Sequence, residues 1–534
     1  MFYTQVPSRP RASAVGIHAG RIVSLDHELE PALFDEVYDL RGATVVPGFN
    51  DAHCHLTYIG QALSQVDLRP TVCRSMDALL AAVGAACAAA GRGAVVQGAG
   101  YDQNHLGGEH PTAEQLDAVS QAHPVWLVHN SRHMGVANTA LFEAAGFADR
   151  RGAVAPEGGL VPLDAQGRAV GLLQETAQAL VTAAIPAPSV DDLAAMVDAG
   201  SRKVLSLGIT SISEPGLGAP EHLGMSVVDL AGYQLAKDTG RLGVRATVMP
   251  YLTTLHALGS SDGSFGLDLG IRTGLGDEWL RLGPVKILSD GSLIGRSAFM
   301  SSDYHAAPDS RGFLQFRAET LREMIVGAHR AGWQVAAHAI GDAALDVVLD
   351  IFQEAQRLAP RPDARHRIEH LSVASDAQIR RVVELGLVPV PQGRFIFELG
   401  DGVRKALGPE RTQLAYRVRS LVDAGLEIPA STDAPVVEPD PIQNIDALVN
   451  RRTAAGADFG PEERISVEQA IRAYTVGSAY ANHDEHHKGT LAPGMLADLA
   501  VLSEDLHQVP VDQISQVTVT ATVVSGHVVS GDLP

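Results

Sequence analysis

The feature that most constrains the fold is a repeated alternation between an amphipathic helical pattern and a short apolar run. Five helical patterns each end near a glycine and lead directly into a β-rich segment. A helix that stops at glycine just before an apolar strand is the repeating unit of a parallel α/β sheet. The five units are residues 189–213, 226–252, 317–342, 376–392 and 415–435.

Three further strand-like segments bring the number of candidate strands to eight. They are residues 45–55, 284–291 and 365–372. Eight parallel strands that alternate with helices close into a barrel, so we predict an α/β fold of the (β/α)8, TIM type. In such a barrel the active site lies at the C-terminal ends of the strands, where residues from separate units converge.

Two other regions depart from this alternation. One stretch has its own strands and helices, and we interpret it as an inserted α/β subdomain that borders the active site. The two ends of the chain both have β patterns, and we expect them to pair in one small β-sandwich because chain termini often lie close together. The predicted units are a composite sandwich of residues 1–47 and 485–534, a barrel of residues 48–70 and 190–484, and an insert of residues 71–189.

Composition and charge exclude several classes of partner. Apolar residues make up 46% of the chain and charged residues 19%, which allows a large core and argues against disorder. The net charge of -21 repels phosphates and anionic lipids, so we expect no nucleic acid and no membrane as partner. The cysteines form no metal-type pair, and the N-terminus lacks a signal-peptide core. We therefore expect a cytoplasmic protein.

The strongest local signal for chemistry is the segment PGFNDAHCHL, which contains His53 and His55. Side chains at positions i and i+2 of an extended strand share one face, so both imidazoles can point into one site. Two neighbouring nitrogen ligands suit a divalent transition metal. The alternative is a chance pair at the surface, and the place of these histidines after an apolar run favours ligands.

Other predicted strands also end in polar residues that could converge at the same mouth. WQVAAHAIGD contains His338, RHRIEHLS contains Glu369 and His370, and EIPASTDAP contains Asp433. Each histidine taken alone could be a buried structural residue. Four histidines and one aspartate at the ends of separate strands make that explanation improbable for the whole set, and they indicate a metal site at the barrel mouth.

The sequence resembles the amidohydrolase superfamily over nearly its whole length, and in particular its family 3 branch, which includes N-substituted formamide deformylases. The resemblance is carried by PGFNDAHCHL, VKILSDGSLIGRSA, AAHAIGD, RIEH, STDAP and GTLAPGMLADLAVL, and by HNSRHMGVANTAL in the insert. It implies that His53, His55, His338 and His370 bind one or two divalent metal ions, with zinc the ion we expect. It also implies that Asp433 contacts the metal site and acts as the general base.

The resemblance extends to four further residues. Lys286 matches a position where the superfamily often has a carboxylated lysine that bridges two metals; a cationic lysine paired with Asp290 or with a substrate group is the alternative. His133 is expected to reach the site from the insert and hold the substrate carbonyl, and a structural histidine is nearly as good an interpretation. Asp290 and Arg296 could position substrate or form a loop ion pair.

Together these features predict a metal-dependent hydrolase that cleaves a C–N bond in an amide, a formamide or a cyclic amide. A deaminase of the same superfamily is one alternative, although such enzymes supply a glutamate after the fifth-strand histidine, where this chain has Ala339-Ile340-Gly341-Asp342. A barrel that has lost its chemistry and serves as a binding scaffold is another. We expect a small-molecule substrate, and a homodimer is the working hypothesis for the oligomeric state.

Overall fold

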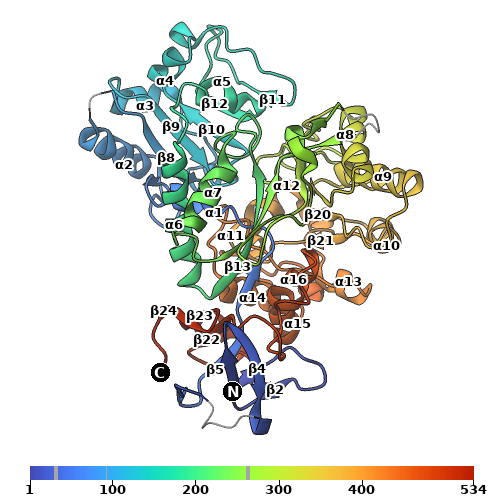
Figure 1. The fold of residues 1–534 in the computed structure, drawn as a ribbon. Helices are drawn as coiled ribbons and strands as arrows, with labels where there is room; N and C mark the ends of the chain where they lie inside the picture. The colour runs from blue at the N-terminus through green and yellow to red at the C-terminus, as the bar shows by residue number, and fades with distance from the viewer. Residues whose placement is uncertain (29–33, 92, 260–264) are drawn as a thin grey trace.

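Parallel strands form two four-stranded sheets at the centre of the chain. The computed structural model describes residues 1–28, 34–91, 93–259 and 265–534 (Figure 1). The first sheet has the order β17-β14-β13-β6, and the second has the order β18-β19-β20-β21. Their bounds are β6 Phe49–Asp51, β13 Ile209–Leu217, β14 Arg245–Pro250, β17 Leu280–Leu282, β18 Val285–Leu288, β19 Val335–Ala339, β20 Arg367–His370 and β21 Val388–Val390.

Short contacts connect the two sheets on both sides. On one side Tyr251 and Lys286 form a parallel bridge, and the fourth strand is interrupted between β17 and β18 at Gly283-Pro284. On the other side Gln392 bridges to Ser431. The Ala52 amide then donates to the Ala430 carbonyl over 3.0 Å. This arrangement fits a TIM-type fold, as the alternation of helices and strands predicts.

The eighth predicted strand differs from the other seven. The segment 426–435 is not a regular strand in the described structure, although it takes part in the bridge and the hydrogen bonds on either side of it. Pro429 and Pro435 are the physical reason, because proline has no amide hydrogen to donate to a strand ladder.

Helices cover the parallel strands, and each predicted helix of the five repeat units is present. α6 shows why they form: Ser189 and Asp192 make a reciprocal capping box, and the apolar face that includes Val197 and Val204 is buried. The helices are α6 Val190–Leu205, α7 Asp229–Asp238, α8 Ala318–Arg330, α10 Asp376–Glu384 and α13 Val418–Asp423, with α9 Asp342–Leu358, α11 Arg394–Glu398, α12 Gly400–Thr412, α14 Pro441–Asn450 and α15 Val467–Arg472 in addition.

The insert is built on a separate six-stranded sheet with the order β11-β12-β10-β9-β8-β7. It lies at one end of the molecule beside α1 and α6 (Figure 1). Its first strand begins at Val66 and its last ends at Glu175. The bounds are β7 Val66–Asp67, β8 Val96–Tyr101, β9 Val125–His129, β10 Met134–Ala137, β11 Gly159–Leu160 and β12 Leu172–Glu175, with α1 Leu56–Ala62, α2 Met76–Ala89, α3 Ala113–Val119 and α4 Thr139–Ala144 nearby in the chain.

Both ends of the chain meet in one sheet at the opposite end of the molecule (Figure 1). Its order is β2-β1-β5-β22-β23-β24, so β5 lies between a strand near the start of the chain and one near its end. The hairpin of β3 and β4 packs on the same apolar cluster. The bounds are β1 Phe2–Tyr3, β2 Arg11–Ala12, β3 Val15–His18, β4 Arg21–Leu25, β5 Thr44–Pro47, β22 Leu499–Leu502, β23 Val519–Val524 and β24 His527–Gly531.

Two further predictions concern cysteines and membranes. Cys54, Cys73 and Cys87 are free and buried. Within the described ranges, no helix has the length and apolar character that crossing a bilayer requires.

Candidate metal centre

His53 and His55 follow β6 directly and are held by the segment that contains Asp433. The Asp433 amide donates to the His53 carbonyl over 2.7 Å, and the His55 amide donates to the Ala434 carbonyl over 2.9 Å. Both side chains are almost completely buried, and their ring centroids are 5.4 Å apart. The two imidazoles therefore lie side by side, although the strand β6 ends at Asp51 and the backbone of His55, with φ -84° and ψ 80°, is not that of a regular strand.

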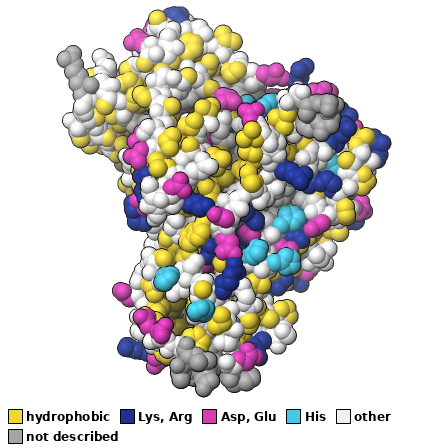
Figure 2. Space-filling model, in the orientation of Figure 1, with side chains coloured by type: hydrophobic (Ala, Val, Ile, Leu, Met, Phe, Trp, Pro, Cys, Tyr) yellow, Lys and Arg dark blue, Asp and Glu magenta, His cyan; other side chains and the backbone are white. Residues whose placement is uncertain are grey.

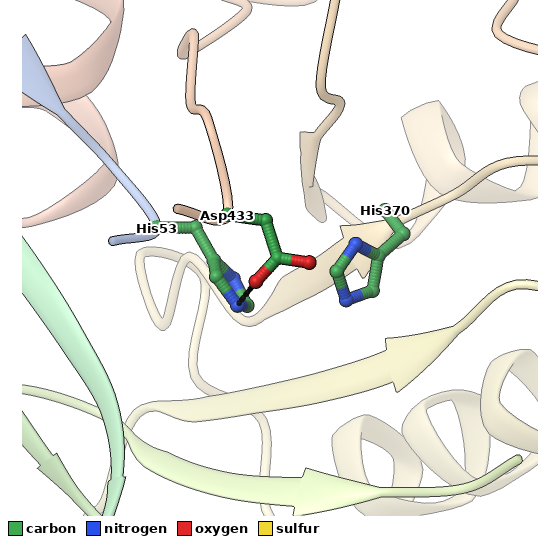
Figure 3. Close-up of side chains that lie close together, drawn as sticks. All are labelled: His53, His370 and Asp433. Carbon is green, nitrogen blue, oxygen red and sulfur yellow. Dashed lines mark ion pairs between the residues drawn. The ribbon is translucent and has the colours of Figure 1, made fainter. Parts of the chain in front are cut away.

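His338 and His370 come from the ends of two neighbouring strands, β19 and β20. Their ring centroids are 4.5 Å apart, and that of His370 is 5.0 Å from that of His53. Asp433 Oδ1 lies 3.2 Å from Nε2 of both His53 and His55. Figure 3 shows the Asp433 carboxylate between the rings of His53 and His370. One ligand atom each from His53, His370 and Asp433 lie within 4.8 Å of one another.

Each of the four imidazoles has one ring nitrogen next to a polar group on its outer side. His53 Nδ1 contacts Glu369 Oε2, and His370 Nδ1 donates to Gln392 Oε1 over 2.7 Å. His338 Nε2 donates to the Gly291 carbonyl over 3.1 Å, and His55 Nδ1 lies 3.4 Å from Glu214 Oε1. Because a proton on the outer nitrogen leaves a lone pair on the other, this pattern is typical of histidines that bind metal. The donor set fits a divalent metal ion.

Burial and charge favour the protonation states that metal binding needs. Burial holds the pKa values of His338 and His370 well below the ordinary value, so both rings are neutral and offer a lone pair. Burial alone would raise the pKa of Asp433. The attraction of His53, together with hydrogen bonds to His53 and His55, outweighs burial and holds that pKa well below its usual range. The carboxylate is therefore ionised at neutral pH.

Lys286 extends from β18 into the same region and is 1% exposed. Burial lowers the pKa of its amine to about 8, against the attraction of Glu369 and Asp433. Among the described residues no carboxylate oxygen lies within 4 Å of Lys286 Nζ, so the alternative ion pair with Asp290 is not formed.

The histidines, Lys286 and Asp433 line one polar cavity of about 60 Å³. His133 lines it too, and its Nδ1 lies 2.8 Å from Glu175 Oε2, both residues being supplied by the insert. The insert therefore contributes residues to the wall of this cavity.

Asp290 and Arg296, the two predicted substrate-binding residues, lie elsewhere. Neither is among the residues that line this cavity, and they form no ion pair with each other in the described part of the chain. The Asp290 carboxylate accepts hydrogen bonds from the amides of Phe299, Ile340 and Gly341 over 2.9, 3.1 and 2.8 Å. It also lies 3.3 Å from His338 Nε2, so it supports the loop and the histidine behind the cavity.

The sequence did not predict which polar residues contact the ring nitrogens of the site histidines. Glu175, Glu214 and Gln392 each contact a site histidine, although none stands beside that histidine in the chain. Glu369 was visible in RIEH next to His370, yet it contacts His53. The only available signal was a polar residue at a strand end. Such a position does not indicate which histidine ring the residue contacts.

Replacing Glu369 by Gln is expected to weaken metal binding by about 10- to 100-fold, the usual effect of removing a group that supports a ligand. The carboxylate orients His53 and is itself held by Arg367, whose Nε lies 2.7 Å from Glu369 Oε1. Titration with a metal-competing chelator measures the change. Glu319→Gln, at an exposed position of α8, is the control. Equal affinities in the wild type and Glu369→Gln would contradict the role given to Glu369.

Comparison with known proteins shows the family of this chain. The chain matches the amidohydrolase family over residues 36–530. It is 32% identical to Protein LONG AFTER FAR-RED 3 of Arabidopsis thaliana, covering 94% of this chain and 85% of that protein. It is 29% identical to the N-substituted formamide deformylase of Arthrobacter pascens, covering 96% and 94%.

A solved structure extends the likeness to the fold. An uncharacterized metal-dependent hydrolase from Pyrococcus horikoshii OT3 superposes with a TM-score of 0.75 at 27% identity, covering 96% of this chain and 97% of that one. The family match spans the insert, the parallel strands and the part of the terminal sheet that begins at β5. From its sequence, its fold and its cluster of buried histidines, this chain belongs to the amidohydrolase family.

Proposed function

We propose that the protein hydrolyses a C–N bond in an amide, a formamide or a cyclic amide. The observation that carries this proposal is the set of four buried imidazoles whose outer nitrogens face polar groups, gathered around the Asp433 carboxylate. The formamide deformylase relative supports amide chemistry. His53, His55, His338, His370 and Asp433 would hold one or two divalent ions, for which zinc is our first candidate.

The chain's own residues would then divide the work of hydrolysis. A divalent ion in this site would polarise the scissile carbonyl and acidify the attacking water. Asp433 takes the proton from that water as its oxygen bonds to the carbonyl carbon. The same carboxyl group then gives the proton to the leaving nitrogen as the C–N bond breaks. One water is consumed and Asp433 is regenerated as the carboxylate; the products are a carboxylic acid and an amine, which stay in one molecule when the substrate is a cyclic amide.

We propose that His133 holds the carbonyl oxygen of the substrate. Burial lowers the pKa of its ring, but the attraction of Glu175, the hydrogen bond to Glu175 and the attraction of Asp433 and Asp290 together raise the pKa above the ordinary value. When it is protonated, the ring donates one N–H to Glu175 and leaves the other for an oxygen in the cavity. Asp290, by contrast, is proposed to position His338, and Arg296 is kept as a candidate for substrate contact from outside the cavity lining.

Two alternative functions, a deaminase and a binding scaffold, fit these residues less well. A deaminase would need an acidic residue after the fifth-strand histidine, and Ala339 and Ile340 stand there instead. A binding scaffold would tolerate the loss of a ligand or of Asp433, whereas all of them are present and buried together. The hydrolase is therefore the function that this geometry favours.

Lys286 is proposed to carry a carboxylate on its amine and so to bridge two metal ions. Carboxylation needs a neutral amine, and burial, with no carboxylate within 4 Å among the described residues, favours that form. The resulting anion would offset two dications that an ammonium would repel. We expect metal loading to depend on bicarbonate and Lys286→Ala to bind at most one ion, as measured by elemental analysis. Full loading without bicarbonate in both proteins would contradict this.

A screen of metal-loaded protein tests the function itself. N-acyl, N-formyl and cyclic amides are offered to protein reconstituted with Zn²⁺, Mn²⁺ or Co²⁺, and release of amine is measured. Hydrolysis of at least one class, lost in the variants discussed below, is the expected result. Failure to reconstitute the protein with any of these ions would favour a binding scaffold over a hydrolase.

Finer features of the architecture belong to the same proposal. We propose that the bridges at Lys286 and Ser431 close the parallel strands into one eight-stranded barrel with the site at its C-terminal mouth. The terminal sheet and the hairpin of β3 and β4 would then form the predicted sandwich. The predicted units, residues 1–47 with 485–534, 48–70 with 190–484, and 71–189, remain our division of the chain.

A further inference from the structure

Arg132 stands at the junction of two cavities. It lines the polar cavity of about 60 Å³ that contains the histidines, and it also lines a neighbouring cavity of about 650 Å³. The larger cavity is mainly apolar, with Ile59, Phe397 and Val437 among its lining, and its volume is in the range of small-molecule sites. A ligand that extends from one cavity into the other must therefore pass this side chain.

The guanidinium of Arg132 packs against the ring of Tyr58. Its Cζ atom lies 3.5 Å from the centroid of the Tyr58 ring, which in turn lies 5.5 Å from the ring of His55. In the described part of the chain no carboxylate is within 4 Å of the Arg132 nitrogens. Apart from its interaction with the Tyr58 side chain, the guanidinium of Arg132 keeps N–H donors that a ligand could use.

Each carboxylate that lines the larger cavity contacts a cationic side chain other than Arg132. Asp67 pairs with Arg69 at 2.6 Å, and Glu398 pairs with Arg394 at 2.8 Å. Glu438 contacts Arg69 and Lys203, and Asp102 lies 3.4 Å from His105. On the face shown in Figure 2, acidic and basic side chains are interspersed, and the whole chain has a net charge of -21. Within the described residues, two cations of this wall, Arg74 and Arg132, have no carboxylate within 4 Å; Arg74 is exposed, whereas Arg132 is half-buried and also lines the cavity of the histidines.

The backbone of Arg132 is also held in an unfavourable conformation. Its φ is +60°, in the left-handed region that favours glycine. Hydrogen bonds fix it there, because the Arg132 amide donates to the His129 carbonyl and Gln178 Nε2 donates to the Arg132 carbonyl. Strained residues of this kind persist where the surroundings impose them, and they are concentrated at functional sites.

We propose that Arg132 determines substrate specificity by binding a carboxylate beside the scissile amide, while the larger cavity holds a bulky apolar substituent. This inference rests on the proposed amide hydrolysis. A guanidinium fork matches one carboxylate with two parallel hydrogen bonds. A dianion such as a phosphate fits less well, because Asp433 and Glu214 are near enough to interact electrostatically with Arg132. The favoured substrate is thus an N-acylated compound with one carboxylate and a large apolar group.

The kinetic test compares two substrates that differ only in the carboxylate. N-acetylphenylalanine, as both enantiomers, and N-(2-phenylethyl)acetamide are used with wild type, Arg132→Met and Arg132→Lys. We expect Arg132→Met to reduce the ratio of their kcat/KM values by about 10- to 100-fold, mainly through KM, because a hydrogen-bonded charge pair is lost. Arg132→Lys keeps the charge but loses the fork, so its ratio should lie in between. Arg404→Met, which removes one exposed cation from α12, should leave the ratio unchanged.

Arg132→Gly separates a binding role from a structural one. Glycine adopts a φ of +60° without strain, so this variant should have a higher Tm than the wild type while it loses the preference for the carboxylate. A residue kept for structure alone would show a lower Tm and an unchanged ratio. An unchanged ratio in both Arg132→Met and Arg132→Gly would overturn the proposal, even if amide hydrolysis were found.

Calorimetric titration with 3-phenylpropanoate and 3-phenylpropanol distinguishes this proposal from the proposed function. It measures binding to the protein as purified and needs no turnover. Preference for the carboxylate that disappears in Arg132→Met would support the role of Arg132 even if neither amide were hydrolysed. Equal binding of both probes by the wild type would contradict it.

Discussion

Replacing Asp433 by Asn is expected to lower kcat by about two to four orders of magnitude, the usual contribution of a general base. Asn has nearly the same shape but cannot accept the proton of the attacking water. The surrounding histidines keep their outer contacts with Glu369, Gln392 and Gly291, so the site should still form.

Metal analysis is the control for this variant. Asp433→Asn is expected to retain a metal content close to that of the wild type, because the four imidazoles remain. A variant with full metal content and normal kcat would mean that another group handles the proton, and the role proposed for Asp433 would be wrong.

Removing His53 should have an even larger effect, because it takes away a ligand and a contact of Asp433 together. Nε2 of His53 lies 3.2 Å from Asp433 Oδ1, while Nδ1 contacts Glu369. His53→Ala is expected to lose the more buried metal position and nearly all turnover. Elemental analysis of protein purified in parallel with the wild type, followed by rate measurements, checks both expectations.

His222→Ala is a matched control for His53→Ala. His222 lines the same cavity, but its ring stacks on Tyr251 at 5.1 Å and lies outside the cluster of the four histidines. We expect this variant to keep its metal. Wild-type metal content and rate in His53→Ala would remove the basis for the ligand assignment.

The fold was predictable to the extent that local patterns repeat. Helices that end at glycine before an apolar strand were recognisable because each unit contains its own signal, and α6 and β13 lie where that signal places them. The interruption at Gly283-Pro284 and the irregular segment around Ser431 were harder, because a short apolar run looks the same whether or not its amides pair.

The site residues were predictable only where a metal-binding residue type stands at a recognisable position in a predicted strand. His53 and His55 share a face through their spacing, and His338 and His370 stand at strand ends. Arg132 had no such signal, because its positive φ depends on hydrogen bonds with His129 and Gln178. Its place between two cavities depends on residues of the insert, of α1 and of the loop after Asp433 that lie far apart in the chain. Glu214 is similar, because it acts through His55, which is far from it in the chain.

The terminal sheet has a consequence for how the protein is made. On the ribosome, β5 emerges early, but its neighbour β22 is synthesised only after almost the whole remaining chain. All four residues of β5 are buried in the finished sheet, so until then the nascent chain has an apolar strand with an open edge. Such an edge pairs readily with other chains. A polypeptide that stops before Leu499 should therefore aggregate rather than simply lack a tail, and slow translation should increase the need for a chaperone.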